Sequence, residues 1–466
     1  MRSLNVGILG HVDCGKTTLT KRLAQLASTS AFDKHAEAGG RRNTLDLGFS
    51  SVIIADRRIA LIDCPGHSAL IRAVLASSNV FDMAIMAQTA EHLLLVSIFC
   101  PRNLIIVLNK IDLIEAAEIE NVKKKLRRGL KTVGVDEKCA IVEMSLHDDH
   151  FQQERLDVLK VAIEEKLFEP ERFVEKPLLV AIDHCFSIKG KGTILTGSVI
   201  QGKLNIGHDI EFPCLNETRR VKTLQCWKEN VNAIEAGERA AMMVSNFDET
   251  KFSRTIGSSP GYLQSIKECL ASVNPITFFR SAVKSKTKMH ISIGYETIMA
   301  ECQFLRDFGD EFEQLSEMEA PCVVLLKFEK PVHVCPDSST FFMASRLDQN
   351  GKGCRFAFTG VVQKILSEND QIPRFSRKCR TGIIERVEND GFSAICTGMF
   401  KPETNFDVFR DMKVTTSDGT IGRIEGAFGK NGKFRVIFDA KIAPKQEIEL
   451  NMKKYLHQNL IKSYLK

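Results

Sequence analysis

The sequence Gly10-His-Val-Asp-Cys-Gly-Lys-Thr17 decides the fold of the N-terminal region. It fits the phosphate-loop pattern G-x-x-x-x-G-K-[ST], in which backbone N–H groups and the start of the following helix bind phosphates. An apolar run, Leu4–Leu9, precedes the loop, and a segment with helical spacing, Thr17–Ala27, follows it. This order of strand, loop and helix is the one that the pattern requires, so it predicts a nucleotide-binding domain.

The first third of the chain alternates between strand-like and helical patterns. Because strands that alternate with helices form βαβ units, this rhythm predicts a mostly parallel sheet. A β-hairpin is expected about Asp56 and Arg57. The other predicted strands are 83–87, 104–109 and 140–142, and the predicted helices are 114–130 and 152–167.

Residues of the phosphate loop and its helix form the first part of the candidate site. Lys16 is expected to reach the β- and γ-phosphates, and the Thr17 hydroxyl is expected to bind Mg²⁺. Asp13, Gly15 and Thr18 belong to the same predicted phosphate site.

A second motif, Asp63-Cys-Pro-Gly66-His67, follows a predicted strand. The Asp63 carboxylate there can hold Mg²⁺ through water, and the Gly66 N–H can contact the γ-phosphate. His67 is placed to orient an attacking water. Thr44, in the polar stretch before the hairpin, is the expected second Mg²⁺ ligand. Its loop should become ordered when the γ-phosphate is bound.

A third motif, Asn109-Lys110-Ile-Asp112, also follows a predicted strand. A carboxylate that accepts the N1–H and N2–H of guanine rejects adenine, so Asp112 favours GTP over ATP. Ser145 and Leu146 follow the next predicted strand and are expected to complete the guanine site.

The pattern changes near Pro170–Pro177, after which strands and glycine turns follow without amphipathic helices. This predicts β-barrels. The expected fold is therefore a P-loop GTPase domain with a mostly parallel sheet, followed by three β-barrel domains. A predicted strand at 284–290 would carry basic residues on one face, and the polar stretch 366–378 is expected to be a linker. The expected domain limits are 1–172, 173–265, 266–368 and 377–466.

The charge is concentrated near the end of the chain. Residues 371–466 contain 18 Lys and Arg against 11 Asp and Glu, whereas the whole chain has a net charge of +6. A basic module of this kind suggests a polyanionic partner such as nucleic acid. A basic surface that only faces solvent is the alternative.

Cysteine usage bears on location. The 14 cysteines are scattered, without the two-residue spacing of a zinc knuckle. No leader-like segment precedes the first strand, and no apolar run is long enough to span a bilayer. We expect free thiols in a reducing cytoplasm and no membrane partner.

With these motifs in order, the chain resembles the translational GTPases, including the layout of elongation factor Tu. Two stretches, Thr44–Ser50 and Ala181–Thr193, narrow the resemblance to the selenocysteine-specific elongation factors in their eukaryotic form. Gly360 and Gly426–Phe434 fit the later barrels of that family. The resemblance is specific in the first 200 residues and looser beyond about Asn246.

The resemblance implies a function. GTP, GDP and Mg²⁺ would be the cofactors of a GTPase that acts as a monomer. The protein would deliver selenocysteyl-tRNA to the ribosome at recoded UGA codons and hydrolyse GTP on codon recognition. The basic module would engage the ribosome and the machinery of the selenocysteine insertion element, which consists of an RNA and its binding protein.

The resemblance also implies an aminoacyl pocket of Phe49, Asp183, His184 and Arg239. A selenol ionises more readily than a thiol or hydroxyl, so cationic His184 and Arg239 would favour a selenolate over a neutral seryl group. Asp183 would keep His184 protonated. From the residues alone, a structural Asp-His pair at a strand end is the simpler interpretation.

One departure from the family pattern lies in the polar loop. The family has Arg-Gly-Ile-Thr where this chain has Arg41-Arg42-Asn43-Thr44. Asn43 replaces half of the apolar gate beside the catalytic histidine, with Val12 as the other half. Control of GTP hydrolysis is therefore expected to differ here, whereas Thr44 and His67 are intact.

Two other functions compete with this interpretation. One is a general elongation factor or an initiation-factor γ-type GTPase that binds other charged tRNAs. The other is a GTP-gated binding protein with no tRNA cargo.

Overall fold

The computed structural model describes residues 3–11, 13–24, 26–27, 48–64, 80–87, 90–100, 103–136, 138–146, 152–188, 192–245, 247, 254–294, 296–336, 340–348, 353–367, 370, 372–429 and 431–456. The chain divides into two compact units. The first contains Met1–Ser281, Lys288–Glu301 and Lys327–Leu366, and the second contains Ala282–Thr287, Cys302–Leu326 and Ser367–Lys466.

The N-terminal domain of the first unit is built on a seven-stranded sheet with the order β2-β3-β4-β1-β5-β6-β7. β4, β1, β5, β6 and β7 are parallel to one another, while β3 runs antiparallel to β4 and β2 antiparallel to β3. The mostly parallel sheet is therefore confirmed. The strands are β1 Leu4–Gly10, β2 Leu26–Ala27, β3 Gly48–Ile54, β4 Arg57–Asp63, β5 Met83–Ala87, β6 Leu104–Leu108 and β7 Ala140–Glu143.

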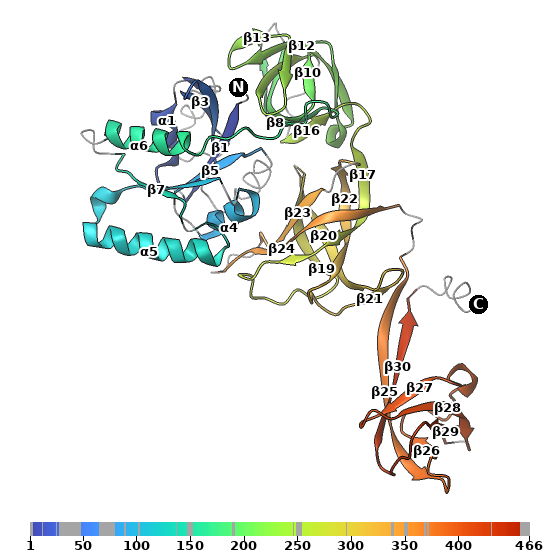
Figure 1. Ribbon diagram of the computed structural model, residues 1–466. Coiled ribbons are helices and arrows are strands. Elements are labelled where there is room, and N and C mark those ends of the chain that lie inside the picture. Colours follow the sequence, from blue (N-terminus) through green and yellow to red (C-terminus); the bar gives the residue numbers. More distant parts are fainter. Residues whose placement is uncertain are drawn as a thin grey trace. The chain divides into compact units, whose positions relative to one another are not determined.

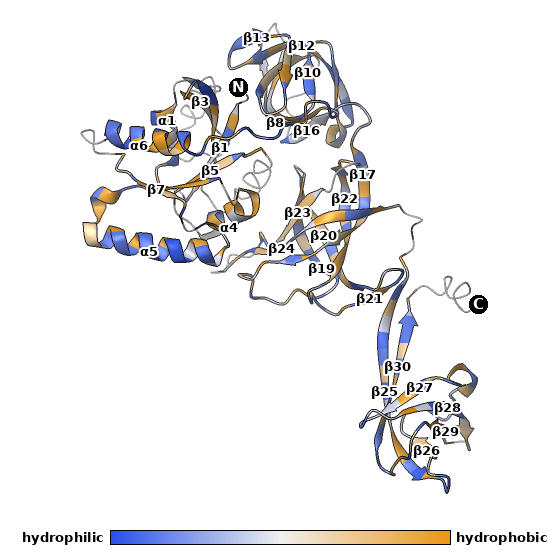
Figure 2. Ribbon diagram, in the orientation of Figure 1, coloured by the Kyte–Doolittle hydropathy of each residue, from blue (hydrophilic) through white to orange (hydrophobic). Residues whose placement is uncertain are grey.

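Helices cover both faces of this sheet (Figure 1). They are α1 Lys16–Leu23, α4 Ala90–Phe99, α5 Ala116–Thr132 and α6 Gln152–Glu164. Alternate residues of each strand serve the two faces: Ile105 packs with α1 and α6, whereas Ile106 packs with α4 and α5. α5 is largely hydrophilic along its length (Figure 2). Among the described residues, no helix has the length and apolar character needed to cross a bilayer.

A closed barrel follows. Its strands are ordered β11-β16-β8-β9-β15-β12-β13, and pairing of β11 with β12 closes the ring around a core that includes Phe212 and Met242. The strands are β8 Leu179–Ile188, β9 Gly192–Gln201, β10 Lys203–Asn205, β11 Asp209–Phe212, β12 Glu217–Cys226, β13 Glu229–Val231, β14 Ala233–Glu235, β15 Arg239–Val244 and β16 Thr255–Ser258.

Further strands of the first unit pair in the order β19-β23-β24-β17, with β18 also on β24. They pack against the N-terminal domain: Phe99 of α4 meets Phe341 edge-on, with ring centroids 5.4 Å apart. The strands are β17 Gln264–Ser272, β18 Asn274–Pro275, β19 Thr287–Ile293, β23 Phe341–Ser345 and β24 Phe356–Leu366. Two longer strands, β20 Glu296–Asp307 and β22 Val323–Val334, are divided between the two units.

The second unit contains a barrel of six strands in the order β25-β26-β29-β28-β27-β30, closed by a long pairing of β30 with β25. Ile384, Phe434 and Val436 are fully buried in its core. The strands are β21 Phe312–Gln314, β25 Arg374–Val387, β26 Ser393–Thr397, β27 Lys413–Thr416, β28 Ile421–Phe428, β29 Lys433–Phe438 and β30 Glu447–Tyr455. The predicted fold class, an α/β domain followed by β-barrels, is confirmed.

Two local predictions in the N-terminal domain were wrong. The first helix ends at Leu23 rather than Ala27, because residues 26–27 form a strand on β3. The hairpin turns at Ala55 and Asp56, whose φ values are 49° and 58°. Positive φ at both central residues matches the twist of the flanking strands in a two-residue hairpin.

Two predictions further along the chain were also wrong. Lys286 has a φ of 70°, so the chain turns there and β19 begins only at Thr287. The basic residues from Lys284 therefore do not share one strand face. The expected linker is also shorter, because β25 begins at Arg374.

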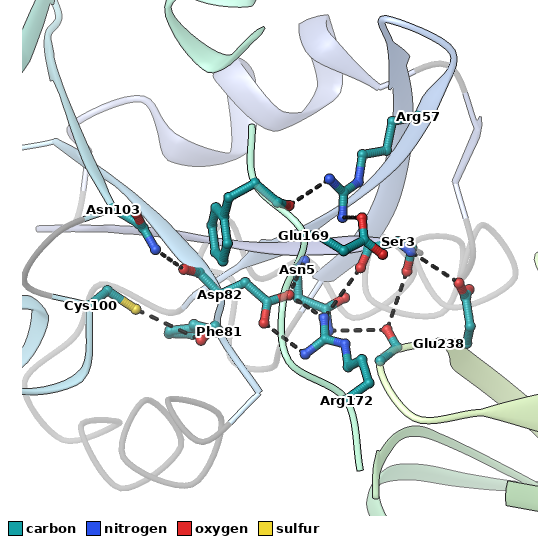
Figure 3. Close-up of polar contacts among 12 residues, drawn as sticks. Ser3, Asn5, Arg57, Phe81, Asp82, Cys100, Asn103, Glu169, Arg172 and Glu238 are labelled. Atoms are coloured by element: carbon teal, nitrogen blue, oxygen red, sulfur yellow. Dashed lines mark hydrogen bonds and ion pairs between the residues drawn. The ribbon is translucent and has the colours of Figure 1, made fainter. Parts of the chain in front are cut away.

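A buried polar network joins the N-terminal domain to the first barrel (Figure 3). The Arg172 guanidinium grips both carboxylate oxygens of Asp82, and the two side chains are about 10% exposed. Asn5 donates its backbone N–H to Asp82 at 2.8 Å and its side-chain amide to the Gly237 carbonyl at 3.1 Å. A Cβ on Gly237 would lie 2.2 Å from Arg172 Nε, so only glycine fits there.

Replacing Arg172 with alanine should lower the free energy of unfolding by about 3–5 kcal/mol, because the Asp82 carboxylate would remain buried without its counter-ion. The single tryptophan, Trp227, is buried in the adjoining barrel and reports unfolding in urea by its fluorescence. The matched control is Lys203→Ala, because the Lys203–Glu235 pair is about half exposed and should contribute less than about 1 kcal/mol. Equal urea midpoints for the two variants would contradict the role of the network.

Candidate functional site

The phosphate loop connects the end of β1 to the start of α1. Gly15 precedes the helix with a φ of 94°, a left-handed conformation that favours glycine. A Cβ there would lie 2.2 Å from the Asn109 side-chain nitrogen. Two constraints therefore require glycine at position 15: the left-handed backbone conformation and the close approach of the Asn109 side chain. Asp13, with a φ of 60°, and Thr18 are exposed beside it.

The phosphate loop and the second motif meet through Thr17 and Asp63. Thr17 Oγ1 donates to Asp63 Oδ2 at 2.6 Å. The contact arises because β4 lies parallel to β1, with Asp63 opposite Ile8. Lys16 is buried, and its ammonium donates to the His11 carbonyl of the loop at 2.5 Å. Two predicted magnesium ligands and the predicted phosphate-binding lysine thus lie together.

The third motif is held against the same loop. Asn109 donates its side-chain amide to the Cys14 carbonyl at 2.9 Å, and Ser145 Oγ donates to Asp112 Oδ1 at 2.6 Å. Asp112 is exposed at the end of this motif. Leu146 lies beside Gly15, 3.4 Å from the position of a Cβ there. The predicted guanine residues surround one end of the phosphate loop.

Three predicted residues, Thr44, Gly66 and His67, lie outside the described residues, as do Val12 and the Arg42-Asn43 pair.

A second cluster brings together the four residues of the expected aminoacyl pocket. Arg239 donates to both oxygens of Asp183, and His184 Nδ1 lies 2.8 Å from Asp183 Oδ1. The Arg239 guanidinium also stacks on Phe49, with Cζ 3.4 Å from the ring centroid. Phe49 meets His184 edge-on, with ring centroids 6.2 Å apart. Phe49 comes from β3, whereas the other three residues come from β8 and β15 of the first barrel.

A β-bulge explains how two consecutive residues, Asp183 and His184, can both contribute side chains to this cluster. β8 pairs Ile182 with Gly197 and His184 with Thr196, so the register shifts at Asp183. In a regular strand, Asp183 and His184 would point to opposite faces. The extra residue of a bulge re-aims the side chains and makes their contact possible.

The electrostatics of the cluster centre on Asp183. Burial alone would raise the pKa of this carboxyl, but the charge and hydrogen bonds of Arg239, together with those of His184, outweigh burial and hold the pKa below its usual range. Asp183 is therefore ionised at neutral pH, and its charge is matched by Arg239.

The structure adds two residues to this cluster that the sequence analysis did not name. Thr196 Oγ1 donates to Asp183 Oδ1 at 2.9 Å, and Ser198 Oγ accepts from Arg239 at 3.2 Å. Both are buried on β9. Their signal in the sequence was two hydroxyl side chains two positions apart in an otherwise largely apolar strand, which places both on one face.

Three family comparisons match separate parts of the chain. The family described as "Elongation factor Tu GTP binding domain" matches residues 1–188. The family described as "Selenocysteine-specific elongation factor, eukaryotes, 3rd domain" matches residues 270–321, and "eEFSec C-terminal RIFT domain" matches residues 371–462.

Characterised relatives match over nearly the whole chain. A selenocysteine-specific elongation factor of Mus musculus is 31% identical, covering 96% of this chain and 90% of that protein. A selenocysteine-specific elongation factor of Methanocaldococcus jannaschii is 28% identical and covers 97% of both chains.

Solved structures share the fold. The translation elongation factor SelB of Methanococcus maripaludis, in complex with the GTP analogue GPPNHP, has a TM-score of 0.79 at 23% identity, covering 98% of this chain and 99% of that one. A bacterial selenocysteine-specific elongation factor has a TM-score of 0.63 at 20% identity, covering 79% of this chain and 60% of that one. The match to the mouse protein shows the family. With a GTPase domain of the elongation factor Tu type at its N-terminus, the chain belongs to the selenocysteine-specific elongation factors.

Proposed function

We propose that this protein binds selenocysteyl-tRNA in its GTP form, delivers it to the ribosome at recoded UGA codons and hydrolyses GTP on codon recognition. The observation that carries the proposal is the buried cluster of Phe49, Asp183, His184 and Arg239, in which one aromatic and three ionisable side chains converge. Such a cluster beside a GTPase domain fits selection of an ionisable aminoacyl group.

The side chains of Thr17 and Asp63 in the nucleotide site suit Mg²⁺. Thr17 and Asp63 offer two oxygen atoms 2.6 Å apart, and hard cations prefer oxygen ligands. When bound, the ion would neutralise charge on the β- and γ-phosphates. Thr17 would bind it directly, Asp63 through water, and Thr44 would complete the protein ligands in the GTP form.

β3 connects the nucleotide site to the aminoacyl cluster. Gly48 pairs with Asp63, and the next residue, Phe49, lies under Arg239. The loop that carries Thr44 leads directly into this strand. Ordering of that loop by the γ-phosphate would therefore fix Phe49 and complete the pocket, so charged tRNA would be bound in the GTP form.

His67 is the residue that we propose to orient the attacking water, as its motif indicates. Asn43, beside Thr44, would replace an apolar gate residue with a polar one, so hydrolysis control is expected to be looser than in the family pattern.

Selectivity in the pocket would depend on one net charge. The carboxylate of Asp183 is matched by the guanidinium of Arg239, so a charged His184 would add one positive charge to the cluster. A selenolate would neutralise it. A seryl hydroxyl offers no negative charge to balance it, which is unfavourable among buried groups.

The basic module is proposed to bind the ribosome and the selenocysteine insertion element with its binding protein. Lys378 and Arg380 are two positions apart on β25, so their side chains lie on the same face of this strand. Lys454 of β30 lies opposite Ser376, which belongs to the same face. These cations share one face of the β25–β30 pair, so they offer a positive surface to a polyanion.

We also propose domain limits at 1–172, 173–265, 266–368 and 377–466, and action as a monomer in the cytoplasm. Support for the compartment comes from the cysteines: all 14 are free thiols, as a reducing environment favours.

Asp112→Asn tests the guanine site. The carboxylate should accept two hydrogen bonds from guanine, each contributing about 1.5–3 kcal/mol, so GTP affinity should fall by at least about 100-fold. Affinity for xanthosine triphosphate should rise, since that base offers an acceptor where guanine offers a donor. Titration with fluorescent nucleotides measures both. The control is Asp136→Asn, an exposed carboxylate beyond α5, which should change neither affinity.

His184→Gln tests the aminoacyl pocket. Removing the His184 imidazole should weaken protection of selenocysteyl-tRNA from deacylation by roughly 10- to 100-fold, because a charged hydrogen bond to the selenolate would be lost. Protection of cysteinyl- and seryl-tRNA should change by less than about threefold. Protection is measured with a GTP analogue bound.

The control for this test is His208→Gln, the same change at an exposed histidine of the same barrel. Equal protection of all three tRNAs by the unmodified protein would argue against the pocket. Stronger protection of initiator or standard tRNAs would favour a general elongation or initiation factor.

A further inference from the structure

A cluster outside the nucleotide and aminoacyl sites brings together a thiol, a carboxylate and an imidazole. Cys214 lies in the 3₁₀ turn Pro213–Leu215 of the first barrel, Glu296 begins β20 and His333 lies near the end of β22. All three belong to the first unit. Cys214 Sγ is 2.7 Å from Glu296 Oε1 and 3.6 Å from His333 Nδ1, and His333 Nδ1 is 3.2 Å from Glu296 Oε1.

The three donor atoms converge on one point. A nucleophile–base–acid relay would use the two imidazole nitrogens for different partners. Here the thiol and the carboxylate both approach Nδ1 of His333. Three unlike ligand atoms within 4.8 Å of one another match the arrangement of a metal site instead.

The spacing can be compared with tetrahedral zinc. Zn–S, Zn–N and Zn–O bonds of about 2.3, 2.05 and 2.0 Å place S and N about 3.6 Å apart, N and O about 3.3 Å apart, and S and O about 3.5 Å apart. The first two agree with the observed 3.6 and 3.2 Å. The third, Cys214 Sγ to Glu296 Oε1, is 2.7 Å, so these two atoms would have to move apart by about 0.8 Å when the ion binds.

The charges also call for a cation. Glu296 has a side chain only 18% exposed, and within the described part of the chain it forms no ion pair with lysine or arginine. A thiolate at Cys214 would place a second anion beside this carboxylate. A divalent ion would stabilise both groups at once, and a coordinating thiol loses its proton.

The ligands stand on rigid supports. His333 lies between the buried residues Val332 and Val334, and Cys214 follows fully buried Phe212 by two positions. Ser292 and Thr297 hydroxyls lie 2.9 Å apart across the hairpin that precedes and includes Glu296. Exposure of Cys214 leaves a route for an ion and a fourth position for water.

We propose that Cys214, Glu296 and His333 bind one Zn²⁺ ion. Sulfur and imidazole ligands favour zinc over Mg²⁺, which separates this site from the nucleotide site by its chemistry. Binding replaces the thiol proton, which is released to solvent. The ion would fasten the 3₁₀ turn of the first barrel to two strands of the module that follows it, and so stabilise the first unit.

The test uses the full chain, freed of metal with a chelator and saturated with GDP and Mg²⁺. Zn²⁺ binding is measured by titration, and Co²⁺ serves as a spectroscopic substitute whose sulfur-to-cobalt absorption reports a thiolate ligand. The unmodified protein should bind one equivalent tightly, show that absorption, and unfold at a higher temperature with Zn²⁺ than without it.

Cys214→Ser should abolish the absorption and the thermal shift, and His333→Gln should weaken Zn²⁺ binding by more than about 100-fold. The matched control is Cys379→Ser, an exposed thiol in β25, which should change nothing. Should Cys214→Ser fail to fold, His333→Gln carries the test. An unchanged cobalt spectrum in either site variant, or no tight Zn²⁺ binding by the unmodified protein, would overturn the proposal and leave a hydrogen-bonded triad.

Discussion

The register between β3 and β4 is the constraint on which both sites depend. Gly48 lies opposite Asp63, and Phe49 lies opposite Ile62. Successive residues of a strand point to opposite faces, so a slip of one residue would turn Phe49 away from Arg239 and move the strand end away from Asp63. One short antiparallel pairing therefore sets the nucleotide site and the aminoacyl cluster relative to each other. It also places the stretch that carries Thr44 directly before the residue that stacks on Arg239.

Two buried ion pairs connect separate segments of the first unit. Arg172 and Asp82 link the N-terminal domain to the segment that enters the first barrel, and Arg239 and Asp183 link the strands beneath the aminoacyl cluster. In each pair the guanidinium contacts both carboxylate oxygens, a geometry that compensates the loss of water. Pairs of this kind specify one arrangement, because any other arrangement leaves a charge buried without a partner.

Ligand chemistry separates the polar clusters of the first unit. Thr17 and Asp63 present oxygen atoms, which suit a hard cation beside phosphates. Cys214, Glu296 and His333 present sulfur, oxygen and nitrogen, a set that suits zinc. The aminoacyl cluster has no such convergence on a single point, because the Arg239 guanidinium occupies the space between Asp183 and Phe49. The three clusters thus differ in the atoms that they bring together: oxygen alone, a mixture of sulfur, oxygen and nitrogen, and a pair of opposite charges.

Sequence alone determined what depends on neighbouring residues. The phosphate loop and the two following motifs are short segments whose backbone and spacing carry their chemistry, so Lys16, Asp63 and Asp112 could be named before any contact was known. The β-rich modules were also predictable, since strand periodicity is local. Turn positions and element ends were less so: the positive φ of Lys286 and the start of β25 are set by the strands to which they pair.

Only the tertiary structure decided which side chains from distant parts of the sequence contact one another. Asp183 and Arg239 are 56 residues apart, and their pairing depends on the register of the barrel strands. It also depends on a β-bulge in β8 that the residue types of this strand do not predict. Thr196 and Ser198 became part of the cluster for the same reason. Cys214, Glu296 and His333 come from three separate segments, and nothing in their spacing suggests a site. Local sequence fixes what each group can donate or accept, whereas the chain's path through space fixes which partner it meets.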